Sequence, residues 1–182
     1  MNNIRDTIQK ILMVIRNKYI GEVENMNKQE DRNNRIRELR MKLNRRIMCK
    51  ELGDIIDKLE DKSFISVEDT IEISKKVYEK IDITIEQQEI QKDINDNLIK
   101  VTVLKDKYST ILNEYGILFH KEDRECGAIK VKVEDFFKNI GYIVKFTGFE
   151  DGYRDLIFVG QDLEYGICIE EYEYYNKLIS WN

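Results

Sequence analysis

Three carboxylates in the last third of the chain are candidates for binding a divalent cation. Glu134 lies in the first turn of a predicted helix, Asp155 opens a nearly apolar strand, and Glu170 lies in the strand that follows. If the two strands pair as a hairpin, Asp155 and Glu170 come near each other, with Glu134 supplied by the helix. Carboxylate oxygens suit Mg²⁺, so metal-dependent hydrolysis is the chemistry that such a cluster serves.

The elements that must position these carboxylates follow from spacing and composition. Phe136, Phe137 and Ile140 recur at helical spacing, and Gly141 suits the C-cap of the helix they define. Three strands joined by short polar or glycine-containing turns are predicted next, over residues 142–147, 155–159 and 166–174. The sequence therefore predicts a helix followed by a small sheet.

This segment, Val133–Tyr175, resembles the Mrr-type restriction-endonuclease-like domain, a branch of the PD-(D/E)xK nuclease superfamily. A helix with an early Glu is followed by Gly-Tyr, a strand, an Asp-Gly turn, Asp-Leu-Ile, a hairpin and a final strand ending in Tyr. In that family the helix Glu, the Asp before Leu-Ile and a Gln/Glu-x-Lys pair hold the metal and the attacking water. The resemblance implies that Glu134 corresponds to the helix Glu and Asp155 to the Asp before Leu-Ile.

The chain departs from the family at the Gln/Glu-x-Lys pair, which falls on Cys168 and Glu170. A carboxylate cannot supply the positive charge that the Lys provides near the phosphate, and Cys168 removes an oxygen ligand. If the site is retained, Glu134, Asp155 and Glu170 are its catalytic residues, and Asp155 and Glu170 bind Mg²⁺. The alternative is a plain helix-plus-hairpin unit, in which Asp155 caps a turn and Glu170 lies on a solvated face.

Charge is distributed unevenly along the 182 residues, which contain no proline and nine glycines. Residues 1–50 hold 13 Lys and Arg against 6 Asp and Glu, whereas residues 51–182 hold 17 against 29. The absence of proline favours long helices. A phosphate backbone would be attracted to the N-terminal part and repelled from the C-terminal part.

The N-terminal part is predicted to be helical, with an amphipathic helix over residues 3–20 and a long polar helix from Lys28 toward Asp61. The basic face of the long helix is a candidate for contacting nucleic acid or an acidic partner; it carries Arg32, Arg35, Arg37, Arg40, Lys42, Arg45 and Arg46. The alternative is a solvated helix surface, because no aromatic residue interleaves the run to stack on bases.

Two further helices are expected before the sheet. Ser66-Val67-Glu68-Asp69 has the form of a capping box and opens a helix toward Ile81. A fourth helix is predicted to reach Tyr115, with a heptad seam of Ile94, Leu98, Val101, Tyr108, Leu112 and Tyr115. That seam either packs within the chain or pairs two copies as a homodimer. The predicted fold class is α+β, with a helical arm of hairpins or coiled coil over residues 1–115 and a helix-plus-sheet domain over residues 116–182.

The sequence predicts a cytoplasmic protein, because it lacks membrane and secretion signals. No stretch is long and apolar enough to span a bilayer, and charges interrupt the N-terminal helix where a signal peptide would be apolar. Cys49, Cys126 and Cys168 lack metal-ligand spacing and are interpreted as reduced thiols of a cytoplasmic protein. His120 stands alone in a polar stretch and is interpreted as a surface residue.

These features leave two main classes of function. The first is a non-catalytic interaction protein, or pseudo-nuclease, that acts on nucleic-acid machinery through a protein or ribonucleoprotein partner and needs no cofactor. The second is a Mg²⁺-dependent DNA or RNA endonuclease. The small size, acidity and lack of motifs also resemble, in type, anti-CRISPR inhibitors of bacterial nuclease defence. A structural coiled-coil adaptor is a third class.

Overall fold

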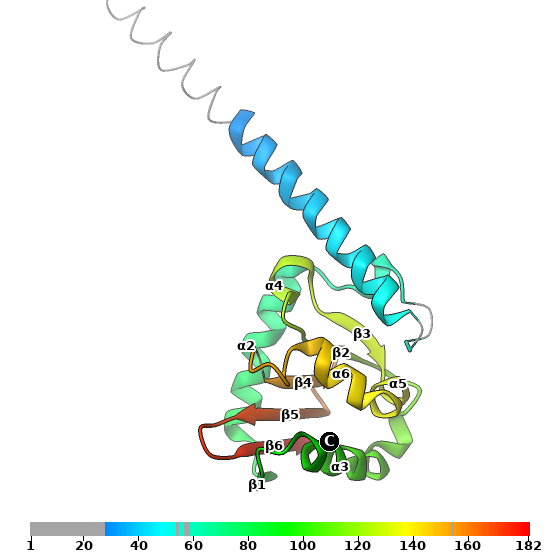
Figure 1. Cartoon of the computed structure of the whole chain (residues 1–182), viewed down its shortest axis with the longest axis vertical. Coiled ribbons are helices and arrows are strands. Elements are labelled where there is room, and N and C mark those ends of the chain that lie inside the picture. The colour runs from blue at the N-terminus through cyan, green and yellow to red at the C-terminus, as the bar shows by residue number, and fades with distance from the viewer. Residues whose placement is uncertain (1–27, 54, 57–58, 154) are drawn as a thin grey trace, which may run out of the picture. The chain divides into compact units, whose positions relative to one another are not determined.

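The computed structural model describes residues 28–53, 55–56, 59–153 and 155–182 (Figure 1). The chain forms two compact units, Met1–Leu43 and Asn44–Asn182. In the first unit residues 28–43 are helical, and the helix expected over residues 3–20 lies outside the described residues. In the second unit residues 44–52 are helical, and the helix expected to reach Asp61 stops beside Gly53.

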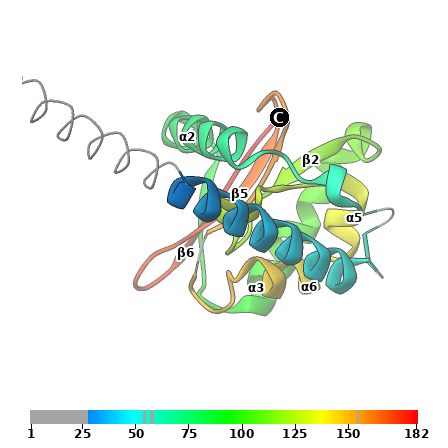
Figure 2. The same cartoon turned by 90° about the horizontal axis from the view of Figure 1, so that it is seen from above.

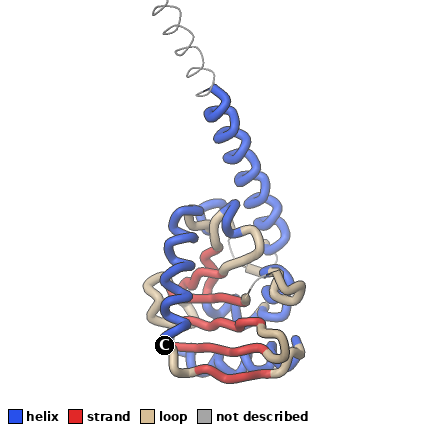
Figure 3. Tube along the Cα trace, turned by 90° about the vertical axis from the view of Figure 1, so that its left-hand side faces the viewer, coloured by secondary structure: helices blue, strands red, loops and turns tan. Residues whose placement is uncertain are grey.

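The second unit is built on one antiparallel sheet of six strands in the order β1-β6-β5-β4-β2-β3. Figure 3 shows these strands side by side in a single layer. The strands are β1 (Gln87–Ile90), β2 (Tyr115–Leu118), β3 (Ile129–Lys132), β4 (Leu156–Gly160), β5 (Gly166–Glu171) and β6 (Asn176–Trp181). The mixture of helices and sheet confirms the predicted α+β class.

Helix α2 (Val67–Ile83) covers one face of the sheet. The Ser66 side chain accepts a hydrogen bond from the Asp69 amide at the first turn, which confirms the predicted helix start. Val77 and Ile81 pack in the same core cluster as Ile117, Phe119, Ile157, Val159, Cys168 and Ile179. Strand residues whose side chains point to this face therefore lie under α2.

The opposite face is covered by α3 (Ile94–Val103), α5 (Val133–Lys138) and α6 (Ile140–Thr147), and Figure 2 shows α2 on one side of the strands with α3 and α6 on the other. Phe136 of α5 stacks on Phe158 of β4 at 4.1 Å between ring centroids. Phe158 alternates with Ile157 and Val159, so the two faces of β4 enter two different apolar layers.

Three predictions for this unit are wrong. Residues 142–147 lie in α6, where Ile140, Ile143, Val144 and Thr147 are buried at helical spacing. A short, almost wholly apolar run fits both the period of a helix and the period of a strand. Its β-branched and aromatic residues favoured a strand, and that prediction is wrong. The third strand, expected over residues 166–174, ends at Glu171 and a turn leads into β6. Strand β1 lies in the part that was expected to be helical, and β2 begins at Tyr115, where the fourth helix was expected to end.

The helix predicted to reach Tyr115 ends at Val103 and continues as the 3-10 helix η2 (Leu104–Ile111). Two positions of its heptad seam, Val101 and Tyr108, are fully buried within the second unit. The Tyr108 hydroxyl donates to the carbonyl oxygens of Gly166, at 2.7 Å, and Trp181, at 3.1 Å. The compact unit that contains the sheet spans Asn44–Asn182 and includes α2, β1 and α3, whereas the helix-plus-sheet domain was predicted over residues 116–182.

His120 follows β2 and is fully buried, so its interpretation as a surface residue is wrong. Its Nε2 atom lies 3.0 Å from the Gly127 carbonyl oxygen, and its Nδ1 atom accepts a hydrogen bond from the Glu122 amide. The preceding run Ile117-Leu118-Phe119 is buried throughout and carries the histidine into the interior. Within the described part of the chain, no helix has both the length and the apolar character needed to cross a membrane.

Candidate functional site

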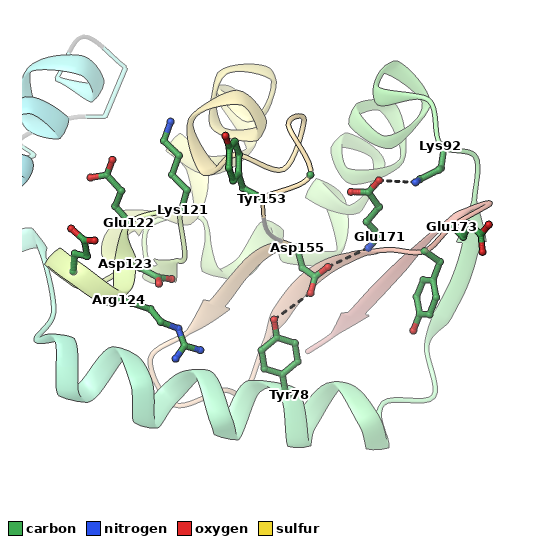
Figure 4. Close-up of a pocket in the computed structure, with 13 residues that line it drawn as sticks. Tyr78, Lys92, Lys121, Glu122, Asp123, Arg124, Tyr153, Asp155, Glu171 and Glu173 are labelled. Carbon is green, nitrogen blue, oxygen red and sulfur yellow. Dashed lines mark hydrogen bonds and ion pairs between the residues drawn. The ribbon is translucent and has the colours of Figure 1, made fainter.

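A polar cleft of about 760 Å³ opens where β4 begins and β5 ends (Figure 4). It is bounded by α2, by α4 (Asp123–Cys126) and its preceding turn, by the turn before β4, and by the β5–β6 connection. Its lining residues are Tyr78, Lys92, Lys121, Glu122, Asp123, Arg124, Glu125, Gly152, Tyr153, Asp155, Glu171, Tyr172 and Glu173. The cleft contains Asp155, the residue on which the predicted metal site was centred.

Both oxygens of the Asp155 carboxylate accept hydrogen bonds inside the second unit. The Tyr78 hydroxyl of α2 donates to Oδ2 at 3.2 Å, and the Glu171 backbone amide donates to Oδ1 at 3.2 Å (Figure 4). Asp155 thus ties the end of β5 to the start of β4 and to α2. This arrangement agrees with the alternative in which the residue serves the fold at a turn.

Asp155 and Glu170 lie close along the sheet, as the predicted hairpin requires. Leu156 is paired with Ile169, which makes Asp155 and Glu170 the next positions on the two strands. The Glu170 side chain accepts a hydrogen bond from the Tyr172 hydroxyl at 3.1 Å, and Glu170 is paired with Lys177 of β6. The Glu170 carboxylate is therefore engaged by Tyr172 of the turn between β5 and β6.

Glu134 lies away from this pair. Its helix α5 follows β3, whose last residue Lys132 is paired with Tyr115; the next residue, Gly116, is paired with Gly160 at the far end of β4. The length of β4, on the order of 15 Å, therefore separates Glu134 from Asp155. Among the residues that the structure describes, no three His, Cys, Asp or Glu side chains are grouped so that they could hold a metal ion.

Cys168, which stands where the resembled family has a metal ligand, is buried in the core cluster under α2. Its neighbours on the paired strands are Ile157 of β4 and Ile179 of β6. A buried thiol in an apolar cluster supplies no oxygen ligand, so this position does not suit a hydrated cation.

The cleft carries an excess of negative charge. Six of its lining residues are acidic (Glu122, Asp123, Glu125, Asp155, Glu171 and Glu173) and three are basic (Lys92, Lys121 and Arg124). Lys92 is already paired with Glu171, with 2.6 Å between Nζ and Oε1. Tyr78, Tyr153 and Tyr172 add aromatic surface, and the Tyr153 side chain is 73% exposed. Such a surface repels phosphate and suits Lys- and Arg-bearing ligands.

The predicted basic face is exposed with one exception. Arg32, Arg35, Arg37, Arg40 and Lys42 are exposed in the first unit, and Arg46 is exposed in the second. The side chain of Arg45 is only 11% exposed: its Nε donates to the Cys126 carbonyl at 2.8 Å and its Nη2 to the Ile65 carbonyl at 3.2 Å. Arg45 therefore binds its own unit and does not belong to the exposed basic face.

A family model described as YxiF protein matches residues 48–181. The chain belongs to the YxiF family. The YxiF match contains every residue of the cleft and leaves out Arg32 through Arg46 of the basic face. Comparison with curated proteins gave no match, and neither did comparison with solved structures.

Most cleft residues of this YxiF chain were not identified from the sequence. Tyr78, Lys92, Lys121 and Arg124 come from separate segments that meet only in the folded unit. The signal that was present is the acidic run Glu170-Glu171-Tyr172-Glu173, two members of which, Glu171 and Glu173, line the cleft.

Proposed function

We propose that this YxiF protein is a non-catalytic interaction protein of nucleic-acid machinery whose acidic cleft binds a basic protein surface. The observation that carries the proposal is the charge of the cleft, with six carboxylates against three basic groups. Proteins that bind nucleic acid present Lys- and Arg-rich surfaces to the phosphate backbone. An acidic cleft has the sign needed to occupy such a surface in place of a phosphate.

The arrangement of the predicted catalytic residues supports a non-catalytic role. A nuclease site needs Glu134, Asp155 and Glu170 to hold magnesium together, but Glu134 lies toward the other end of β4 and Asp155 is hydrogen-bonded on both oxygens. If the sheet unit is related to restriction-endonuclease-like domains, it is a pseudo-nuclease. The form of this function that we favour is an inhibitor of a bacterial nuclease defence, of the anti-CRISPR type.

The exposed basic helix supplies a second surface for such a protein. Arg32, Arg35, Arg40 and Lys42 are exposed in the first unit and have the sign to contact the nucleic acid of a ribonucleoprotein partner. The two surfaces have opposite charge and belong to different units, so their contributions can be measured separately by charge reversal on one unit at a time.

The decisive experiment measures binding of a fluorescent arginine-rich peptide by anisotropy at several salt concentrations. The triple variant Glu122→Gln, Glu125→Gln and Glu173→Gln should bind about tenfold more weakly, with a smaller salt dependence, because each exposed ion pair contributes a fraction of a kcal/mol. The matched control removes three exposed acids outside the cleft: Glu68→Gln, Glu79→Gln and Glu164→Gln. Equal weakening by both triple variants would contradict the proposal.

A cleavage assay tests the nuclease alternative directly. Purified protein with magnesium or manganese is expected to leave plasmid and single-stranded substrates intact. Cleavage by the wild type that disappears in Asp155→Ala would overturn the non-catalytic proposal and assign Asp155 to a metal site.

A further inference from the structure

Two buried asparagines line a second cavity, of about 300 Å³, on the other face of the sheet from α2. Asn97 of α3 is 2% exposed and Asn176 of β6 is 4% exposed. The Oδ1 atom of each has no hydrogen-bond partner among the residues that the structure describes. Both oxygens are covered in this structure, and their side chains line the cavity. Buried polar side-chain atoms are nearly always hydrogen-bonded, so two unpaired amide oxygens beside one cavity favour a ligand that donates hydrogen bonds.

The other side chains of the cavity define the charge and shape of that ligand. Glu150 and Glu171 contribute carboxylates and Lys92 one ammonium group, which is paired with Glu171 at 2.6 Å. Phe149, 5% exposed, adds an aromatic side chain to the lining. The cavity therefore combines two amide side chains with unpaired oxygens, an excess of negative charge and an aromatic surface. Its volume is at the lower end of the range for small-molecule sites.

We infer that this cavity binds a guanidinium group. A guanidinium is planar and cationic and carries five N–H donors in a fixed fork, so it can serve both amide oxygens and a carboxylate at once. Its flat face packs on aromatic rings, which an ammonium group does less well. Calcium needs six to eight oxygen ligands. The four oxygen-bearing side chains of this lining supply six oxygens, and Lys92 already pairs with Oε1 of Glu171, which leaves five.

Our assignment of the guanidinium group to an arginine of a protein partner rests on the proposed function. The cavity shares Lys92 and Glu171 with the acidic cleft, and Figure 4 shows this ion pair at the cleft. The two spaces are therefore adjacent, and an arginine of a basic partner bound at the cleft would lie beside the cavity. The other source is a free guanidine compound. Both present the same group to Asn97 and Asn176.

Calorimetric titration of the full chain with agmatine and methylguanidinium tests the site. Neutral N-methylurea, butylammonium and calcium are the comparison ligands, and only the guanidinium compounds are expected to saturate a single site. Asn97→Leu and Asn176→Leu keep the branching and the number of heavy atoms without the acceptor, and each should weaken binding about tenfold or more. Asn95→Leu, on the exposed side of α3, is the matched control and should leave binding unchanged.

Glu150→Gln removes one charge from the exposed side of the cavity and should weaken guanidinium binding even if an asparagine variant fails to fold. Absence of binding by both guanidinium compounds, equal binding of N-methylurea, or saturation by calcium would each overturn the inference. If agmatine binds while the arginine-rich peptide does not, the cavity assignment stands and the proposed function fails. If the peptide binds through the cleft acids while agmatine does not bind, the proposed function stands and the cavity assignment fails.

Discussion

Replacing Arg45 by methionine is expected to lower the free energy of unfolding of the Asn44–Asn182 unit by about 3 kcal/mol. The guanidinium group donates to the carbonyl oxygens of Cys126 and Ile65 and lies 5.1 Å from the centre of the Phe64 ring. It thereby joins the helical residues 44–52 to the segments that precede α2 and β3. Methionine keeps the packing of the aliphatic stem and removes only these polar contacts.

The magnitude follows from the individual contacts of Arg45. A hydrogen bond from a charged donor contributes about 1.5 kcal/mol or more, and the bond to Cys126 is short, at 2.8 Å. The longer bond to Ile65, at 3.2 Å, is assigned about 1 kcal/mol, and the contact with Phe64 about 0.5 kcal/mol. The ion pair with Asp61 spans 3.4 Å and the Asp61 side chain is 71% exposed, so it adds almost nothing.

Urea unfolding monitored by circular dichroism measures the loss. With a denaturant slope of about 2 kcal/mol per molar, the midpoint should fall by about 1.5 M. Arg46→Met is the matched control, because Arg46 is the next residue on the same helical segment and is exposed; its effect should stay within about 0.5 kcal/mol. Equal midpoints for the two variants would show that Arg45 is an ordinary surface arginine and would refute the reasoning.

Two further predictions concern backbone space and alkaline stability. Gly127 has φ +85°, and a Cβ there would lie 2.0 Å from the Ile65 carbonyl oxygen, so Gly127→Ala should cost more than about 2 kcal/mol in urea unfolding. Gly141→Ala in α6 has room and should stabilise by about 0.5 kcal/mol; a loss as large as that of Gly127→Ala would contradict the geometry. Burial raises the pKa of Tyr165 to about 12, so the folded state keeps a proton that the unfolded state releases near pH 10. Stability should therefore fall between about pH 10 and pH 12; Tyr165→Phe should reduce that fall in urea midpoints, and exposed Tyr153→Phe should not.

The parts of the fold that were predicted correctly depend on neighbouring residues. The start of α2 needs only Ser66 and the amide of Asp69, three residues away. The pairing of Leu156 with Ile169 joins strands that are adjacent in the sequence through a short turn. In both places local composition specifies the contact, so a single sequence is enough to predict it.

Tertiary contacts decided the elements that were predicted wrongly. Residues Ile140–Thr147 are apolar enough for a buried strand or a buried helix. In the folded unit they form a helix that packs on one face of the sheet. Strand β1 has the polar sequence Gln-Gln-Glu-Ile, and three of its four residues are exposed. Its strand structure comes from pairing with β6, where Gln87 is opposite Ile179. Nothing local to β1 indicates that partner.

The residues of the candidate sites were likewise predicted only where the signal is local in the sequence. Asp155 was identified because a carboxylate at the mouth of an apolar strand is visible in the sequence. Its hydrogen-bond donor Tyr78 is 77 residues away and carries no local signal. Asn97 and Asn176 likewise lie on α3 and β6 and meet only at one cavity. Sites assembled from distant side chains require the fold before they can be recognised.

In the binding event that we propose, the charge and burial of the two sites favour different roles. Glu125 and Glu173 are exposed and well solvated, so they cost little when no partner is bound, and they would act mainly on the rate of association and its salt dependence. Asn97 and Asn176 are buried, and a donor that reaches them replaces no bulk water on those oxygens, so they would act mainly on the rate of dissociation. A metal site would need its carboxylates convergent and dehydrated. Exposed acids around a cleft beside a buried acceptor pair suit recognition of a cationic side chain.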